Sequence, residues 1–317
     1  MFLFSTRYAR TAIKQALHKI FVASQRLGVS VLPLHFYSSI PDVRDLRGRS
    51  DWKKPRSMRG INLLSIDEQI ALLEEIMPSI ISASSRDLYA EAVAENGVDS
   101  GYGVIETDVL AAFVASRRPA RIVQVGCGVS TAVILSAARI AGYRPNLTCI
   151  DPYPTNYLKR TAADGAITLL SKPAQVVHMD VLTALDGGDL LFIDSTHTVK
   201  PGSEVNRIVL EVLPRLDAGV LVHFHDIYFP YEYARNFLSS DLFFPGETSL
   251  LYAFMLNNPK FRIDLCLSML HYAAPSAMKK SIPKFEPQGN DAGLAASGGR
   301  HFPSSIYLVR IPDLADR

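Results

Sequence analysis

The strongest evidence for the fold lies in one segment of the sequence, Arg121-Ile-Val-Gln-Val-Gly-Cys-Gly-Val-Ser-Thr131. It opens with an apolar run that is typical of a buried strand, and Gly126 and Gly128 follow at once. A helix is predicted to begin directly afterwards, at residues 129–131. This order of strand, glycine turn and helix brings bare backbone and a helix N-terminus up to a nucleotide-like ligand.

Two further strand-like runs end in a carboxylate. Residues 147–151 end at Asp151, in the position of the usual partner of two ribose hydroxyls. Residues 176–180 end in the same way at Asp180. Taken singly, each aspartate reads more simply as a helix cap or a loop carboxylate. Their common register with the glycine turn favours a nucleoside pocket.

From residue 121 onwards, strands alternate with helices. The predicted strands are 121–126, 146–151, 174–181, 189–194, 219–224, 261–267 and 304–311, and the predicted helices are 129–141, 155–165, 203–215 and 247–257. Such alternation predicts an α/β fold with a mainly parallel sheet, whose ligands bind at the carboxyl ends of the strands. Because no helix is predicted between the last two strands, we expect a hairpin with residues 268–303 as a mobile loop.

Positive charge is concentrated near the N-terminus. The 317-residue chain has a net charge of +2, but residues 1–60 carry 12 Lys/Arg and three Asp/Glu, whereas the remainder carries 21 and 28. Residues 7–27 predict a basic amphipathic helix and residues 29–60 an extended arm. We expect the helix to dock on its own domain or on a second copy in a homo-oligomer. Contact with an anionic membrane surface is the alternative.

Several classes of protein are disfavoured by composition. Three cysteines without paired spacing predict neither a disulfide framework nor a zinc site. No apolar run reaches the roughly 18 residues that a membrane span needs. The net negative charge after residue 60 and the lack of a base-flipping motif argue against a nucleic-acid partner. We therefore expect a cytoplasmic protein, peripheral at the membrane at most.

Residues 61–120 are predicted to be helical. Ser65-Ile-Asp-Glu68 has the spacing of a capping box, which would open the first helix of this segment. Thr107 is expected to cap a later helix. Tyr102, in the glycine-rich turn before it, is expected to be exposed and to cover one side of the ligand site.

Residues suited to catalysis follow two neighbouring strands. The apolar run 189–194 ends at Asp194, close to His197, and the run 221–226 ends at His225 and Asp226. Tips of adjacent parallel strands are about 5 Å apart, so these side chains can converge on one point. Two converging carboxylates repel each other unless a cation or a proton lies between them.

This order of elements resembles the class I S-adenosylmethionine-dependent methyltransferases, and most closely their small-molecule O-methyltransferase branch, which includes macrolide-sugar and catechol-type enzymes. The resemblance covers roughly residues 97–268 and 304–311, and its specific motifs are residues 125–131, 193–198 and 222–226. It implies a Rossmann-like, mostly parallel seven-stranded sheet with an antiparallel last strand, to which an N-terminal helical arm is added. The domains would then be the arm 1–60, a helical cap 61–120 and the methyltransferase domain 121–317.

The resemblance also implies S-adenosylmethionine as the cofactor. Its binding residues would be Gly126, Gly128, Ser130, Thr131, Asp151 and Asp180. Ser130 and Thr131 would turn their hydroxyls to the amino-acid carboxylate of the ligand, and Asp180 would lie beside the adenine. One departure concerns Gln124, because the family usually has an acidic residue there. Glu106 is the candidate that would supply the missing negative charge.

In the resembled branch, carboxylates at the positions of Asp194 and Asp226 hold a magnesium ion that binds paired hydroxyls of the acceptor. Asp194 or His197 would then take the proton of the acceptor. His225 is a ligand for a softer ion such as manganese or iron, a general base, or a packed neighbour. A metal-free site with a histidine as base stays open as an alternative.

The favoured function is methyl transfer to an oxygen of a small hydroxylated or sugar-like acceptor. The alternative is a catalytically inactive scaffold with the methyltransferase fold that binds a partner, which Gln124 and the basic arm would suit. A NAD-dependent oxidoreductase is disfavoured, because Thr131 occupies the place of the third glycine in the dinucleotide fingerprint.

Overall fold

The computed structural model describes residues 2–83, 86–98, 101–233, 243–287 and 302–312, which form two compact units, residues 1–52 and 53–317. The first unit contains α1 (Phe2–Gln25), α2 (Val43–Gly48) and the beginning of the short η1 (Asp51–Lys53). The basic helix predicted at 7–27 is thus confirmed as a helix. Within the described residues, no helix has both the length and the apolarity needed to cross a membrane.

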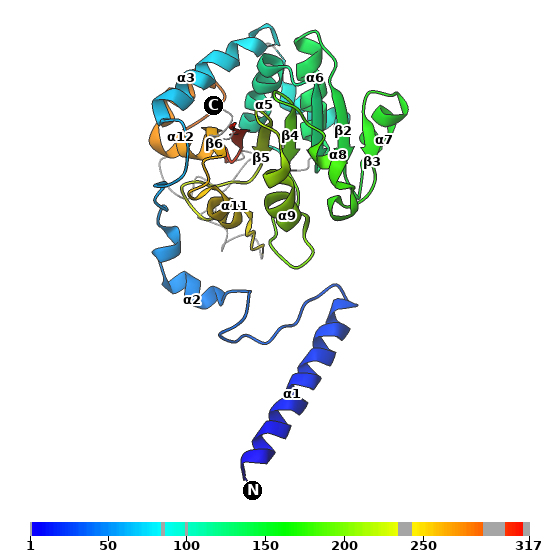
Figure 1. The fold of residues 1–317 in the computed structure, drawn as a ribbon, viewed down its shortest axis with the longest axis vertical. Coiled ribbons are helices and arrows are strands. Elements are labelled where there is room, and N and C mark those ends of the chain that lie inside the picture. Colours follow the sequence, from blue (N-terminus) through cyan, green and yellow to red (C-terminus); the bar gives the residue numbers. More distant parts are fainter. Residues whose placement is uncertain (1, 84–85, 99–100, 234–242, 288–301, 313–317) are drawn as a thin grey trace. The chain divides into compact units, whose positions relative to one another are not determined.

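The second unit is built on a seven-stranded sheet with the order β3-β2-β1-β4-β5-β7-β6 (Figure 1). Its strands are β1 (Arg121–Val125), β2 (Asn146–Ile150), β3 (Thr168–Leu170), β4 (Leu190–Ile193), β5 (Leu221–Phe224), β6 (Phe261–Cys266) and β7 (Ile306–Arg310). The first five strands in the order are parallel, and β7 runs antiparallel to both of its neighbours. The Rossmann-like fold with an antiparallel last strand is confirmed.

The register of the sheet places four residues level with one another at its carboxyl edge. Val125 of β1 pairs with Ile150 and Ile193, and Ile193 pairs with Phe224. The residues that follow these four strand ends are Gly126, Asp151, Asp194 and His225. The ladder continues one step further, since Asp194 N–H donates to Val125 O and His225 N–H donates to Ile193 O. Chain positions far apart in the sequence thus meet at one edge.

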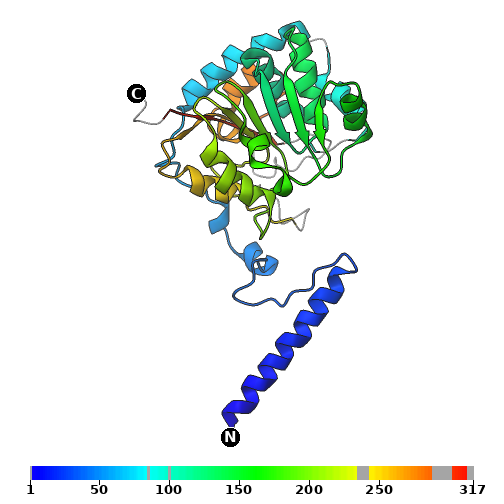
Figure 2. The same ribbon diagram turned by 45° about the vertical axis from the view of Figure 1, so that its right-hand side comes forward.

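Helices cover both faces of the sheet. One face packs against α3 (Ile66–Ile76), η2 (Met77–Ala83), α4 (Leu88–Asn96), α5 (Val104–Arg117), α6 (Val129–Ile140), α7 (Asn156–Ala163), α12 (Leu267–Ala273) and α13 (Pro275–Ser281). The other packs against η3 (Ala174–Val176), α8 (Met179–Thr183), the continuous run α9 (Glu204–Arg207), η4 (Ile208–Val212) and η5 (Leu213–Arg215), and α11 (Glu247–Met255). In Figure 2 the helices of the first face are coloured from cyan (α3) to green (α6 and α7), with α12 and α13 in orange.

Two helix caps were predicted before the first strand of the sheet, at Ser65 and at Thr107. The structure confirms the first and not the second. Ser65 and Glu68 make the expected capping box at the start of α3. Thr107 is not a cap, because α5 already begins at Val104 after Gly103, and Thr107 is fully buried inside it. The prediction at Thr107 was wrong since an apolar first turn can be buried without a side-chain cap.

The strand predicted at 174–181 is wrong. The third strand is the shorter β3, and residues 174–183 form η3 and α8. Pro173 precedes η3, and the His178 side chain accepts the N–H of Asp180 as the cap of α8. Asp180 therefore lies in the first turn of a short helix and not at the end of a strand. A run of β-branched residues alone did not reveal these two helix starts.

The loop predicted at 268–303 is also wrong in its first part, because α12 and α13 lie there. Leu267, Leu270 and Met278 pack into the core from these helices, and Pro275 opens α13. The antiparallel pairing of the strands on either side is confirmed. Residues 288–301 lie outside the described part of the chain, and with them the rest of that prediction.

Candidate active site

Gly126 makes the first turn of the site. Its φ is +80°, and a β-carbon there would lie 1.6 Å from the carbonyl oxygen of Asp194, so the backbones after β1 and β4 almost touch. The carboxylate of Asp151 accepts the N–H of Cys127 at 3.1 Å and that of Tyr153 at 2.7 Å. The glycine turn is therefore closed by a side chain from the end of β2.

Gln124 ties this turn to the start of α6. Its amide donates to Ser130 Oγ at 2.9 Å and to Gly126 O at 3.1 Å, and its Oε1 accepts from Thr131 Oγ1 at 2.9 Å. Thr131 Oγ1 in turn accepts the N–H of Gly128 at 3.1 Å. An amide can donate and accept at once, which a carboxylate at this position could not do. Gln124 thus has a structural role in the turn.

This network corrects the prediction for the two hydroxyls. The side chains of Ser130 and Thr131 are buried and turned inward to Gln124. They are not turned outward to a ligand carboxylate. Sequence could not reveal this because a serine–threonine pair at a helix start serves an inner acceptor as readily as an outer anion.

A cavity of about 400 Å³ opens beside the turn, at the carboxyl ends of β1, β2 and β4. Its lining includes three predicted residues, Gly126, Asp151 and Asp194. The other lining residues are Val125, Ile150, Pro152, Tyr153, Pro173, Ala174, Gln175, Ser195, Thr196 and Glu204. The volume lies in the range of small-molecule and cofactor pockets.

Glu204 is a lining residue that the sequence did not predict. Glu204 accepts the backbone N–H of Thr196 at 3.0 Å and the amide of Gln175 at 2.8 Å. Ser203 caps the helix that begins at Glu204. An acidic residue in the first turn of a helix is common, because it interacts favourably with the helix dipole. The sequence therefore gave no reason to place Glu204 in the cavity wall.

Asp180 does not line the cavity. Its side chain is 84% exposed and pairs with His178. The cavity wall beyond β3 is made by residues 173–175 instead. The prediction that placed Asp180 beside the adenine is corrected because the strand on which it depended is absent.

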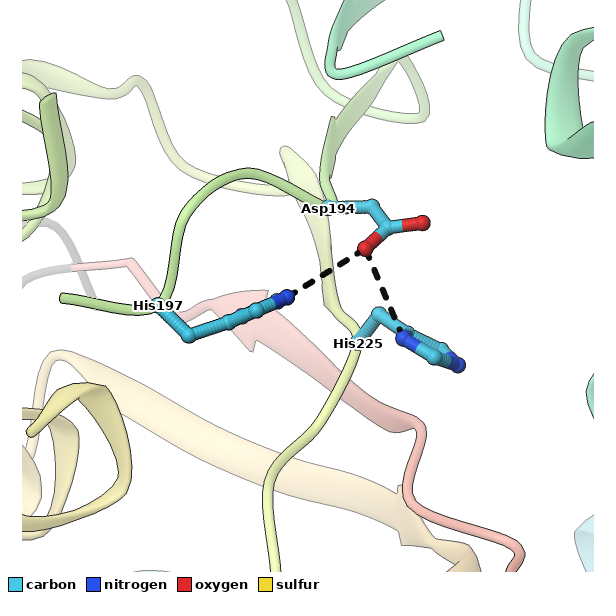
Figure 3. A group of neighbouring side chains, drawn as sticks. All are labelled: Asp194, His197 and His225. Atoms are coloured by element: carbon cyan, nitrogen blue, oxygen red, sulfur yellow. Dashed lines mark ion pairs between the residues drawn. The ribbon is translucent and has the colours of Figure 1, made fainter. Parts of the chain in front are cut away.

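Asp194, His197, His225 and Asp226, called here the acid–histidine cluster, meet beside the cavity. His197 Nε2 lies 3.5 Å from Asp194 Oδ1 and 3.5 Å from Asp226 Oδ2. His225 Nδ1 lies 3.4 Å from the same oxygen of Asp194 and 3.6 Å from the same oxygen of Asp226. Figure 3 shows the two imidazoles directed at one oxygen of Asp194 from different segments. All four predicted residues are thus brought together.

Three further residues support the cluster, and the sequence did not point to them. Glu247, at the start of α11, contacts His197 Nδ1 at 2.7 Å. Tyr228 and Ser304 each donate to Asp226 Oδ1 at 3.0 Å. Glu247 is fully buried, which is costly for a carboxylate unless it is paired. The contact with His197 offsets this cost, and it holds the imidazole in place.

The sequence is similar to known methyltransferases. A family model described as a methyltransferase domain matches residues 123–227, from β1 to just past Asp226. A protein of Archaeoglobus fulgidus described only as uncharacterised is 33% identical over 172 residues, 49% of this chain and 73% of that protein. Residues 123–227 thus form a methyltransferase domain, and the sheet order described above is Rossmann-like.

Solved structures resemble this methyltransferase at low similarity. A methyltransferase of Podospora anserina bound to SAH is 14% identical, with a TM-score of 0.37 over 90% of this chain and 100% of that one. A plantazolicin methyltransferase in complex with SAH is 12% identical, with a TM-score of 0.40 over 78% of this chain and 99% of that one. These likenesses carry no weight for the function of this methyltransferase.

In this methyltransferase, the charges of the aspartates and the histidines in the cluster shift one another's pKa values. Burial by itself raises the pKa of Asp194 and of Asp226, but the positive charges of His225 and His197 hold both pKa values well below their usual range. Burial lowers the pKa of His225, and the two aspartates reverse this and raise it well above its usual value. The cluster is therefore a set of opposite charges in which the histidines are buried and the aspartates are partly exposed.

Glu106 belongs to this cluster's surroundings. It is fully buried, and its Oε1 accepts the backbone N–H of Ser304 at 2.9 Å. Burial raises the pKa of Glu106 to about 6, although the charge of His225 opposes this. Ser304 thus connects Glu106 to Asp226. Glu106 does not line the cavity, and a contact with the cofactor remains a prediction.

Tyr102 is buried, not exposed as the sequence suggested. Its ring centroid lies 4.9 Å from that of His225, with 34° between the planes. Tyr102 therefore packs under the methyltransferase's histidine and cannot act as a lid.

Proposed function

We propose that this methyltransferase transfers a methyl group from S-adenosylmethionine to an oxygen of a small hydroxylated or sugar-like acceptor. One observation carries the proposal: Asp194 belongs both to the cavity wall and to the acid–histidine cluster. A cofactor in the cavity would therefore lie beside groups that can bind and deprotonate a hydroxyl.

The cavity residues fit the cofactor. Asp151 presents a half-buried carboxylate of the kind that binds ribose hydroxyls, and Ile150, Pro173 and Ala174 offer apolar surface to a base. The close approach of backbone at Gly126 leaves no side chain between the strand ends. When bound, S-adenosylmethionine supplies an electrophilic methyl group on sulfur.

The acid–histidine cluster supplies the acid–base chemistry in this proposal. An acceptor hydroxyl must lose its proton as the new carbon–oxygen bond forms. Asp194 or His197 takes that proton, and Glu247 stabilises the charge on His197 through its contact with Nδ1. The two histidines are buried, which strengthens these interactions.

A divalent cation held by Asp194, Asp226 and His225 is part of the proposal. Two aspartates from neighbouring strands approach the same imidazole, which is the arrangement expected around a bound cation. Such an ion would lower the pKa of a bound hydroxyl and orient it.

The proposal is tested with labelled S-adenosylmethionine and a panel of acceptors that includes sugars, catechols, amines and thiols. We expect the wild type to label a hydroxylated acceptor, and the Asp194→Asn variant to do so at least about 100-fold more slowly. Calorimetry should show that both proteins still bind the cofactor. Asp186→Asn, at a side chain that is 77% exposed, is the matched control and should retain full transfer.

Two outcomes would contradict the proposal. One is transfer to amines or thiols without transfer to any hydroxyl. The other is an Asp194→Asn variant that transfers as fast as the wild type.

A further inference from the structure

We infer that a second cavity, outside the proposed active site, binds a small organic amine whose ammonium group pairs with Asp108 and whose apolar part lies against the cavity wall. The cavity has a volume of about 510 Å³, within the range of small-molecule pockets. Among the described residues, its lining has no member in common with that of the cavity beside the glycine turn. The inference goes beyond the proposed function and does not depend on it.

Helices on one face of the sheet line this cavity. It lies among the end of α3, η2, the start of α4, α5 and the end of α13. Its apolar surface comes from Met77, Pro78, Ile80, Leu88 and Pro283. Asp108 lies two residues after Glu106 on α5, which places the two about 200° apart around the helix. Helix α5 therefore presents Glu106 to Ser304, beside the acid–histidine cluster, and Asp108 to the second cavity.

Asp108 is the most buried charged residue of the wall. Its side chain is 10% exposed. The other charged side chains of the wall are 38–81% exposed and belong to Glu74, Arg86, Lys280 and Lys284. Burial raises the pKa of Asp108 above its ordinary value, although the charge of Lys284 opposes this. Because a buried carboxylate is stabilised by a positive charge and destabilised by a second negative one, the cavity favours a cationic ligand.

Asp108 can exchange its present partner for a ligand. Lys284 Nζ donates to Asp108 Oδ1 at 3.1 Å and lies 3.8 Å from Asp87 Oδ1. Since this second acid is within reach, Lys284 keeps a partner when an ammonium group takes its place at Asp108. The other oxygen of Asp108, Oδ2, has no donor among the described residues, and an ammonium group has three N–H donors to offer.

The two more exposed cations of the wall do not make it a site for an anion. Lys280 lies 3.5 Å from Glu74, and Arg86 contacts Glu91. The charges of both cations are thus offset by neighbouring acids and are further screened by water and salt. An anionic ligand would gain little from them, and Asp108 would repel it.

Three probes with the same apolar part and different head groups test the charge preference: phenylbutylamine, phenylbutanol and phenylbutyrate. Each is titrated into the full chain by calorimetry at about pH 7, where the amine is protonated. We expect the amine to bind at one site per chain, about 10–100-fold more tightly than the alcohol, because it adds a hydrogen bond to a buried charge. Phenylbutyrate should bind most weakly.

Variants locate the site. Asp108→Asn should lower the affinity for the amine about 10-fold or more and leave that for the alcohol nearly unchanged. Lys284→Ala should raise the affinity for the amine, since it removes a competing cation, whereas the same change would weaken a site for anions. Glu75→Gln, at a 59% exposed side chain of α3 outside the wall, is the matched control and should bind as the wild type does. Far-UV circular dichroism shows whether each variant is folded.

Several results would overturn the inference. Two of them concern the wild type, and these are phenylbutyrate binding as tight as amine binding, or no binding of any of the three probes. The others are unchanged amine affinity in a folded Asp108→Asn protein and a lowered one in Lys284→Ala. Loss of amine binding in Asp151→Asn in place of Asp108→Asn would also overturn it, by assigning the amine to the cavity beside the glycine turn.

Discussion

At Gly126 the end of the first strand passes so close to the fourth that an alanine β-carbon would lie 1.6 Å from the carbonyl oxygen of Asp194. We expect Gly126→Ala to lower the free energy of unfolding by roughly 3 kcal/mol or more, because backbone must move. Urea denaturation measures this. Gly142→Ala is the matched control: its φ is similar, +68°, but no atom lies within 4 Å, so only about 1–2 kcal/mol of backbone strain is expected. Equal losses in both variants would show that the close approach is unimportant.

The free energy of unfolding is expected to depend on pH through Glu106. Its pKa is about 6 in the folded protein, above the ordinary value of 4.5, so the folded protein holds this proton more tightly than the unfolded chain does. The stabilisation is complete below pH 4.5 and is lost as the pH rises through about 6. A shift of this size corresponds to about 2 kcal/mol.

Glu106→Gln keeps an acceptor for the N–H of Ser304 and carries no charge. The variant should therefore gain up to about 2 kcal/mol of unfolding free energy relative to the wild type between pH 4.5 and 7. Urea denaturation at several pH values, with chelator present, measures the gain. Glu95→Gln, at an exposed position of α4, is the matched control. A constant difference for Glu106→Gln would contradict the prediction.

At this scale the sequence predicted the residues that follow strand ends, because sheet geometry requires them to meet. Asp194, His197, His225 and Asp226 were found in this way. It did not predict Glu247 or Ser304, which come from α11 and from the segment before β7 and reach the site only through tertiary packing. It misplaced the hydroxyls of Ser130 and Thr131, since a side chain's direction depends on partners such as Gln124.

At the scale of elements, Asp189 joins the beginnings of β1 and β4. It accepts the N–H of Arg121 at 2.9 Å, the guanidinium of Arg121 at 2.7 Å and the N–H of Asp186 at 2.9 Å, and its side chain is 5% exposed. We expect Asp189→Ala to cost about 3 kcal/mol, because it leaves buried donors without an acceptor. Chemical denaturation checks this.

Arg121 also provides the control for that change. Its guanidinium contacts Asp186, whose side chain is 77% exposed. Asp186→Ala should therefore cost less than about 1 kcal/mol, as exposed ion pairs do. A loss in Asp186→Ala equal to that in Asp189→Ala would mean that burial does not distinguish the two carboxylates.

Elements with a strong periodic pattern were predicted well, and those that depend on packing were not. The strands that became β1, β2, β4 and β5 are mainly apolar and mostly buried, as strands covered on both faces are. β3 is short and at the sheet edge, so its neighbour at 174–181 was mistaken for it. Helices α12 and α13 were not predicted, because each is only seven residues long and shows too little of a helical pattern.

For the whole molecule, charge separates the two ends of the chain. Residues 1–60 carry 12 Lys/Arg and three Asp/Glu, the remainder 21 and 28, and α1 exposes Ile13 and Ile20. Opposite charges attract at low ionic strength and are screened by salt. We expect the full chain to self-associate in about 0.05 M salt and to dissociate in about 1 M salt, as measured by sedimentation velocity.

Lys14→Glu with Lys19→Glu should abolish the association, whereas residues 53–317 alone should be monomeric in both salts. A full chain that stays monomeric in low salt but sediments with anionic vesicles would contradict self-association. It would assign the basic helix to a membrane surface instead.

The position of β7 between β5 and β6 has a consequence for the order in which the molecule is made. While the chain emerges from the ribosome, β5 has an open edge and β6 has no neighbouring strand in the sheet until residues 304–310 follow. Ser304, which holds both Asp226 and Glu106, arrives in the same short segment. A nascent chain that has completed every earlier element therefore exposes an unpaired strand edge and lacks the hydrogen bonds of Ser304 to Asp226 and Glu106, and synthesis of one short segment supplies both.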